Sequence, residues 1–141
     1  KEVTTEGGLN LNYKKNFLRK LIKNLKKNGT RVSLFIEPKK SDISAAIKLE
    51  ADCVEIHTGK ICNLINKKRS YSKAFQKIKL AVVHGKNLGL EIHAGHGLNF
   101  KSAKILSKIK GISEFNIGHF LIGESIFIGF KNSINKFKKI I

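Results

Sequence analysis

The chain has 141 residues, of which 41% are hydrophobic, and this is enough for the core of one domain. No apolar run approaches the roughly 18 residues that a membrane span needs, so we expect no membrane contact. Cys53 and Cys62 lack CxxC spacing and no secretory signal is visible, which favours the reducing cytoplasm over a disulfide framework. Because the chain opens on Lys1 with loop-like residues, we expect a fragment of a longer protein.

The charge of the chain is strongly positive, with 28 Lys and Arg against 10 Asp and Glu, a formal net charge of +18. A basic nucleic-acid-binding module is therefore an alternative reading. Nucleic-acid readers rely on arginine, but only Arg19, Arg31 and Arg69 are arginines here, and Lys accompanies abundant Ile and Asn, as AT-rich codon usage favours. We expect no nucleic-acid partner and interpret most lysines as solvated helix faces.

Helical and strand patterns alternate along the chain. Apolar residues at helical spacing predict helices over residues 17–25, 41–49, 75–87, 102–109, 122–127 and 130–141. Asn28-Gly29 ends the first predicted helix, and Ser41 is the predicted N-cap of the second. Alternating apolar and polar residues predict strands over residues 31–36, 52–57, 90–94 and 114–117. This order indicates α/β architecture with parallel strands, in a single domain over residues 1–141.

Each predicted strand has one apolar and one polar side. The polar side carries Ser33, Glu37, Glu55, His57, Glu91, His93, Glu114 and Asn116. A doubly wound sheet is covered on both faces and would be apolar on both. A (β/α) barrel accounts for the pattern better, because its interior becomes polar toward the catalytic mouth at the C-terminal ends of the strands.

Histidine and glycine gather at these strand ends, in His93-Ala-Gly-His-Gly97 and Asn116-Ile-Gly-His119. A single histidine at a strand end is more often a hydrogen-bonding residue than a catalyst. Glycines, however, let backbone N–H groups approach an anion, and the start of a following helix adds a favourable dipole. Barrels commonly bind phosphate at the loops after their last two strands. We therefore expect a phosphate site here.

Five segments, in this order, resemble the signature segments of the pyridoxine 5′-phosphate synthase family. They are Glu2-Val-Thr-Thr-Glu-Gly-Gly-Leu9, Val32-Ser-Leu-Phe-Ile36, Val54-Glu-Ile-His-Thr-Gly59, Ala94-Gly-His-Gly-Leu98 and Asn116-Ile-Gly-His119. The resemblance implies that the chain is the C-terminal half of a TIM-type (β/α)8 barrel. It also implies a homo-oligomer, an octamer in the family, that uses no cofactor and no metal.

The implied reaction condenses two phosphorylated small molecules, 3-amino-2-oxopropyl phosphate and 1-deoxy-D-xylulose 5-phosphate, and releases phosphate and water as the pyridine ring closes. By the same resemblance, His96 is the proton donor and Glu55 stabilises the transition state. Contacts to the amino-ketone phosphate are implied for Gly97, Gly118 and His119, and a contact to the deoxyxylulose phosphate for Thr4.

The chain departs from the family pattern at two places, His93, where Asn is usual, and Lys60-Ile61-Cys62, where an aromatic residue is usual. The family's N-terminal strands supply a glutamate base, further histidines and an arginine, and no segment of this chain matches them. We therefore expect the chain by itself to be inactive.

A metallohydrolase is a third reading, with His57, His93, His96 and His119 as candidate ligands beside Glu55. The sequence contains no HExxH motif and no HxH pair with a carboxylate at ligand spacing, which argues against it.

Overall fold

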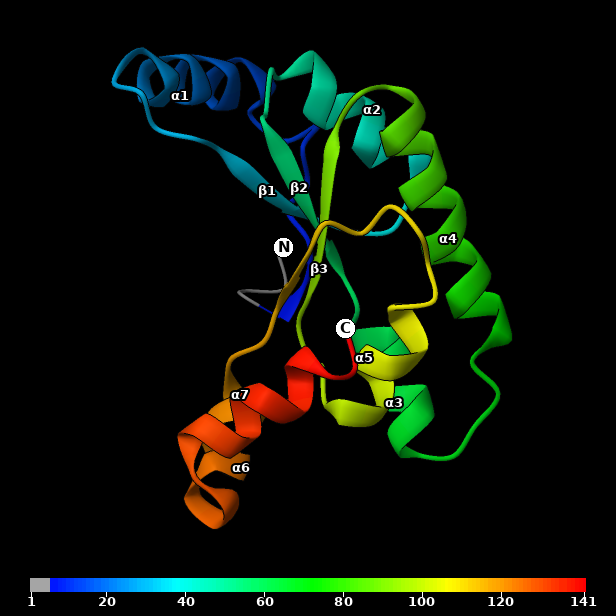
Figure 1. Ribbon diagram of the computed structural model, residues 1–141. Coiled ribbons are helices and arrows are strands. Elements are labelled where there is room, and N and C mark those ends of the chain that lie inside the picture. The colour runs from blue at the N-terminus through cyan, green and yellow to red at the C-terminus, as the bar shows by residue number, and fades with distance from the viewer. Residues whose placement is uncertain (1–5) are drawn as a thin grey trace.

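Four parallel strands form one sheet in the order β1-β2-β3-β4 in the computed structural model, which describes residues 6–141 (Figure 1). The strands are β1 (Ser33–Ile36), β2 (Cys53–His57), β3 (Glu91–Gly95) and β4 (Glu114–Asn116). The helices of this part are α1 (Lys15–Lys27), α2 (Lys40–Lys48), α3 (Gly59–Asn66), α4 (Ser72–Asn87), α5 (Phe100–Leu106), α6 (His119–Ile128) and α7 (Phe130–Lys138). The predicted α/β class is confirmed.

Strands that follow one another in the sequence are neighbours in the sheet. All three pairs are parallel, with Glu55 opposite His93 and Gly95 opposite both His57 and Asn116. Helices connect each strand to the next, which is the arrangement of successive units in a (β/α)8 barrel. Within residues 6–141, β1 and β4 are the two edges of the sheet.

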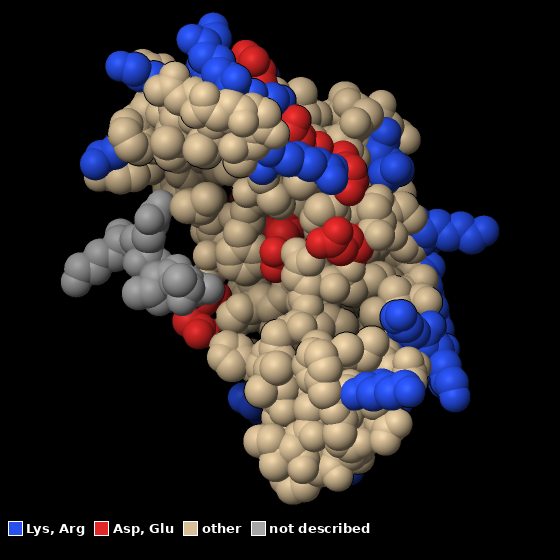
Figure 2. Space-filling model, turned by 60° about the vertical axis from the view of Figure 1, so that its left-hand side comes forward, with Lys and Arg blue, Asp and Glu red and all other residues tan. Residues whose placement is uncertain are grey.

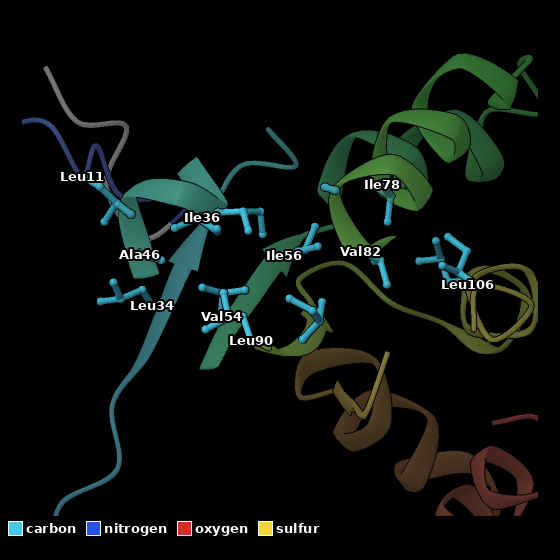
Figure 3. Packing of buried hydrophobic residues seen from close by; sticks show 14 of the residues in the cluster. Leu11, Leu34, Ile36, Ala46, Val54, Ile56, Ile78, Val82, Leu90 and Leu106 are labelled. Carbon is cyan, nitrogen blue, oxygen red and sulfur yellow. The ribbon is translucent and has the colours of Figure 1, made fainter. Parts of the chain in front are cut away.

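The hydrophobic core lies on the apolar face of the sheet, as the alternation predicted. Leu34, Ile36, Val54 and Ile56 point from β1 and β2 toward α2 and α4 (Figure 3). Val54, Ile56 and Ile92 are fully buried. Burial of each such side chain contributes roughly 1.5–3 kcal/mol, so this face anchors the strands whose other face carries the polar residues.

Helix α3 was missed by the sequence analysis, which predicted no element between the strand over residues 52–57 and the helix over residues 75–87. The helix buries Ile61, Cys62 and Ile65, at helical spacing. Its first residue is glycine, and Thr58 at the N-cap forms no capping hydrogen bond, because its hydroxyl is committed to carbonyl oxygens of the β3 loop. The usual start signal of a helix is therefore absent.

Five of the six predicted helix starts lie one to three residues too late, and two of them are explained by their caps. Helix α2 begins at Lys40 with Lys39 as N-cap, and the Ser41 hydroxyl contacts the Asp42 carboxylate instead of a backbone N–H. Helix α5 begins at Phe100, because Asn99 and Ser102 form a reciprocal capping box. The predicted end of α1 is confirmed: Asn28 is the C-cap and Gly29 has φ +74°.

Lysine and arginine lie mostly toward the periphery of the face in Figure 2, and several acidic side chains lie toward its middle. None of the helices in residues 6–141 is long and apolar enough to cross a membrane.

Candidate active site

The C-terminal half of the polar face brings together Phe35, Glu37 and His57. His57 Nδ1 lies 2.7 Å from Glu37 Oε1, and the Phe35 ring packs edge-on against the His57 ring. His57 Nε2 is buried and hydrogen-bonds to none of the described residues. The Nδ1 contact favours a tautomer with the proton on Nδ1, which leaves the Nε2 lone pair on the side of the neighbouring loop.

His96 lies in that loop, directly after β3, in a left-handed conformation with φ 76°. This backbone conformation is unusual for a residue other than glycine, and contacts from a residue outside the loop hold it in place. The Thr58 hydroxyl lies 2.7 Å from the carbonyl oxygens of both Gly95 and His96, and the Thr58 N–H donates to Gly95 at 2.9 Å. Buried Thr58 therefore anchors the loop that presents His96.

The rings of His57 and His96 are in contact, with centroids 4.9 Å apart at an interplanar angle of 68°. Gly59 packs against both rings, since a Cβ there would lie 2.6 Å from His57 Nε2 and 2.9 Å from His96 Cδ2. His96 Nε2 lies 3.4 Å from the exposed carboxylate of Glu6. His57, Gly59, His96 and Glu6 together line a cavity of about 420 Å³.

A second cavity, of about 370 Å³, joins the loops after β3 and β4. It is lined by Glu6, Asn66, His96, Gly97, Leu98, Asn99, Asn116, Ile117, Gly118, His119 and Phe120. Gly97 has φ +76°, a conformation that glycine adopts without strain. Helix α6 begins at His119 and Gly118 is its N-cap with no side-chain cap, so the first N–H groups of the helix lack a side-chain acceptor.

Glu55 lies in the middle of β2 and lines neither cavity itself. Its Oε2 accepts a hydrogen bond of 2.6 Å from Asn116 Nδ2, and Asn116 lines the second cavity. The described site therefore connects His96, Gly97, Gly118 and His119 directly, and Glu55 through Asn116. Thr4 lies outside the described residues.

The pKa values of two groups at the mouth are shifted. Burial alone would raise the pKa of Glu37, but hydrogen bonds from His57 and from the Gly8 N–H outweigh it and hold that pKa below its usual value. Burial raises the pKa of the Cys62 thiol. Cys62, one of the departures from the family pattern, is a buried thiol that lines neither cavity.

The N-terminal half of the polar face has a different character. His93 Nε2 lies 2.8 Å from Glu91 Oε1, and its Nδ1 lies 3.8 Å from Glu114 Oε1. Arg31 forms an ion pair with the other oxygen of Glu91. His93 thus contacts neighbouring carboxylates and lines neither of the two cavities. Nowhere in residues 6–141 do three His, Cys, Asp or Glu side chains converge as a metal site would require.

Three residues of the site, Glu37, Thr58 and Asn116, were given no functional role by the sequence analysis, and His57 was named only as a candidate metal ligand. The alternation had placed Glu37, His57 and Asn116 on the polar face. That signal identifies the face but gives no sign of which polar residues contact one another.

A family model described as "Pyridoxal phosphate biosynthesis protein PdxJ" matches residues 1–141. A protein named pyridoxine 5′-phosphate synthase from Pelagibacter ubique is 54% identical over 140 residues, which are 99% of this chain and 59% of that protein. Proteins of the same name from Ehrlichia chaffeensis and Sulfurihydrogenibium sp. are 46% and 41% identical over 99% of this chain, and the matches cover 56% and 57% of their lengths. This chain therefore spans somewhat more than half of each relative. It belongs to the family of the pyridoxal phosphate biosynthesis protein PdxJ.

Proposed function

We propose that this chain carries the C-terminal half of the active site of a pyridoxine 5′-phosphate synthase. The reaction condenses 3-amino-2-oxopropyl phosphate with 1-deoxy-D-xylulose 5-phosphate and releases phosphate and water. The observation that carries the proposal is the cavity of about 370 Å³ that His96, Gly97, Gly118 and His119 line together. Two consecutive strand-end loops thereby supply both a proton-carrying side chain and an anion-binding backbone.

The phosphate of the amino ketone binds in this cavity. Gly97 and Gly118 have no side chain to keep an anion from the backbone N–H groups, and the N-terminus of the ten-residue helix α6 favours negative charge. His119, the first residue of that helix, adds a ring N–H. Inorganic phosphate soaked into crystals of the full barrel should lie against Gly97 and Gly118, and an empty cavity with another site filled would contradict this assignment.

His96 donates a proton in the reaction. Ring closure requires imine formation, dehydration and loss of phosphate, and each leaving oxygen needs a proton. Histidine carries a proton near neutral pH, and the left-handed loop presents the imidazole at both cavities. Glu55 provides a negative charge close to the cationic imine that forms, and Thr4 contacts the deoxyxylulose phosphate.

The isolated chain is inactive under this proposal, because the family's N-terminal strands supply the base and further charged residues. Its fold is also incomplete as a barrel, since both β1 and β4 are edge strands within the described residues. Such edges pair readily with other chains. The isolated chain should therefore aggregate or self-associate, and a sharp, concentration-independent thermal transition of a monomer would contradict this.

The decisive experiment uses a completed enzyme, in which this chain is joined to the part of the Pelagibacter ubique relative that lies outside the match. We expect it to form pyridoxine 5′-phosphate and the isolated chain to form none. His96→Asn should lower turnover by roughly 10²-fold or more, the scale of a lost general acid.

The matched control is His84→Asn. His84 lies on the outer helix α4, where its Nε2 is 3.0 Å from the Ser44 hydroxyl, and it lines neither cavity. Its replacement should change turnover little. Equal losses in both variants, or a loss in neither, would remove the basis for the role of His96.

A further inference from the structure

Glu55 reaches across the sheet to a partner two strands away. It belongs to β2, Asn116 belongs to β4, and β3 lies between them. The Asn116 Nδ2 nevertheless donates to Glu55 Oε2 at 2.6 Å, a short hydrogen bond to a carboxylate. The Glu55 side chain must therefore pass over β3 on the polar face.

Gly95 is the residue of β3 over which it passes. A Cβ built on Gly95 would overlap Glu55 Oε1 and would also lie 3.1 Å from the Asn116 Cβ. The backbone of Gly95 is not in the left-handed region, so its conformation does not require glycine. What requires glycine here is the space that the Glu55 carboxylate occupies.

We propose that Asn116 is a positioning residue that holds the Glu55 carboxylate in its productive place, and that Gly95 keeps the path between them open. This inference rests on the proposed function, in which Glu55 stabilises the developing cation. It adds that neither residue acts on the substrate by itself, since both act through Glu55.

The proposed chemistry explains why the Glu55 carboxylate must be held in one position. A glutamate side chain has three rotatable bonds, and a carboxylate that stabilises a transition state must already be in place when the charge develops. Among residues 6–141, Asn116 is the side chain that donates to Glu55, and it does so to Oε2. The hydrogen bond thus fixes one oxygen, and Oε1 stays over Gly95.

The test measures pyridoxine 5′-phosphate formation by the completed enzyme with Asn116→Ala. We expect kcat to fall roughly 10- to 100-fold with KM changed by less than about 3-fold, because a misplaced catalytic group slows the chemical step more than it weakens binding. Asn116→Asp keeps the size of the side chain but places a second carboxylate against that of Glu55, so its kcat should fall further than that of Asn116→Ala. Asn132→Ala is the matched control, since the side chain of Asn132, on α7, donates to the Ile128 carbonyl of α6 and to no other described residue.

A double-mutant cycle separates positioning from direct action. If Asn116 acts through Glu55, then Glu55→Gln with Asn116→Ala should be no slower than Glu55→Gln alone, within about 2-fold. Losses that multiply would show that Asn116 contacts the substrate or supports the fold independently, and would overturn the inference.

Gly95→Ala keeps the test valid even if Asn116 variants fold poorly. The atom that a methyl group would displace is the end of a flexible side chain, so the melting temperature should change little while kcat falls by a similar roughly 10- to 100-fold. Full activity of Gly95→Ala would overturn the inference while the proposed function stands. A completed wild-type enzyme that forms no product would overturn the proposed function, and this inference with it.

Discussion

Histidines in the two halves of the polar sheet face have different surroundings. In the N-terminal half, His93 is only 7% exposed and lies between Glu91 and Glu114, and Arg31 pairs with Glu91. In the C-terminal half, the buried Nε2 of His57 bonds none of the described residues, and the acidic partner of His96 among those residues is the exposed carboxylate of Glu6. His93 thus has a carboxylate near each of its ring nitrogens, whereas His57 has one at Nδ1 only, and His57 and His96 both line a cavity.

This difference shows which polar residues serve the fold and which are open to a ligand. Buried polar atoms are normally hydrogen-bonded, so an unsatisfied one needs an explanation. The unsatisfied Nε2 of His57 is explained by its position, because His57 and His96 line the same cavity of about 420 Å³. Three substitutions test the division between the halves, each in the completed enzyme.

The largest effect is expected for Gly59→Ala, at the mouth. The new Cβ would lie 2.6 Å from His57 Nε2 and 2.9 Å from His96 Cδ2, so both rings must move. Under the proposed function, in which His96 donates a proton, a displacement of this size should lower turnover by roughly 10²-fold. Alanine favours the first turn of α3 over glycine by roughly 0.5–1 kcal/mol, so the unfolding free energy should not fall by more than about 1 kcal/mol.

Gly123→Ala is the control for this change. Gly123 also lies in a helix, α6, and a Cβ there has no atom within 4 Å. Its turnover should stay within about 2-fold of wild type, since nothing at the site moves. A Gly59→Ala enzyme as active as Gly123→Ala would show that the ring contact at the mouth has no role.

A smaller effect is expected for Glu37→Gln. The carboxylate orients His57 through its Nδ1, so its loss should lower turnover by roughly 10-fold. The variant also changes the response to acid. Because the pKa of Glu37 is lowered in the folded state, its charged form stabilises the fold above the usual pKa of about 4.5, and this contribution is lost as the pH falls through that region.

The free energy of unfolding, measured with denaturant at several pH values between 7 and 3, therefore tests this contribution of Glu37. The wild type should lose more stability in the acid range than Glu37→Gln. Asp52 and Glu91 also have lowered pKa values, because Lys26 hydrogen-bonds to Asp52 and His93 to Glu91, so the acid loss becomes shallower without disappearing. Identical acid profiles would mean that the Glu37–His57 pair contributes nothing to the folded state.

The sequence predicted the faces of the sheet better than the contacts on them. Alternation along 52–57 and 90–94 is a local property, and it correctly placed Val54 and Ile92 in the core and Glu55 and His93 on the polar side. The resemblance supplied His96 as a proton donor, but not the buried Thr58 that anchors its loop.

The contacts that were missed depend on packing between distant segments. The hydrogen bond between Glu55 and Asn116 joins residues 61 apart in sequence. It can form because Gly95, which lies between them, has no side chain. Helix α3 was missed for a similar reason, since the Thr58 hydroxyl that could have capped it bonds the β3 loop instead. Signals of this kind appear only when the sheet register is known.

The smallest effect is expected for His93→Asn, which introduces the residue that the family pattern usually has. Asparagine is too short to keep both the contact to Glu91 and the approach to Glu114, but Arg31 still pairs with Glu91. Turnover should therefore stay within about 2-fold, and the melting temperature should fall by only a few degrees, as for the loss of one partly exposed pair. Since the hydrogen bond from His93 is the main cause of the lowered pKa of Glu91, the variant should also lose less stability below about pH 4.5. If turnover instead fell tenfold at an unchanged melting temperature, His93 would belong with the mouth residues and the division between the two halves would be wrong.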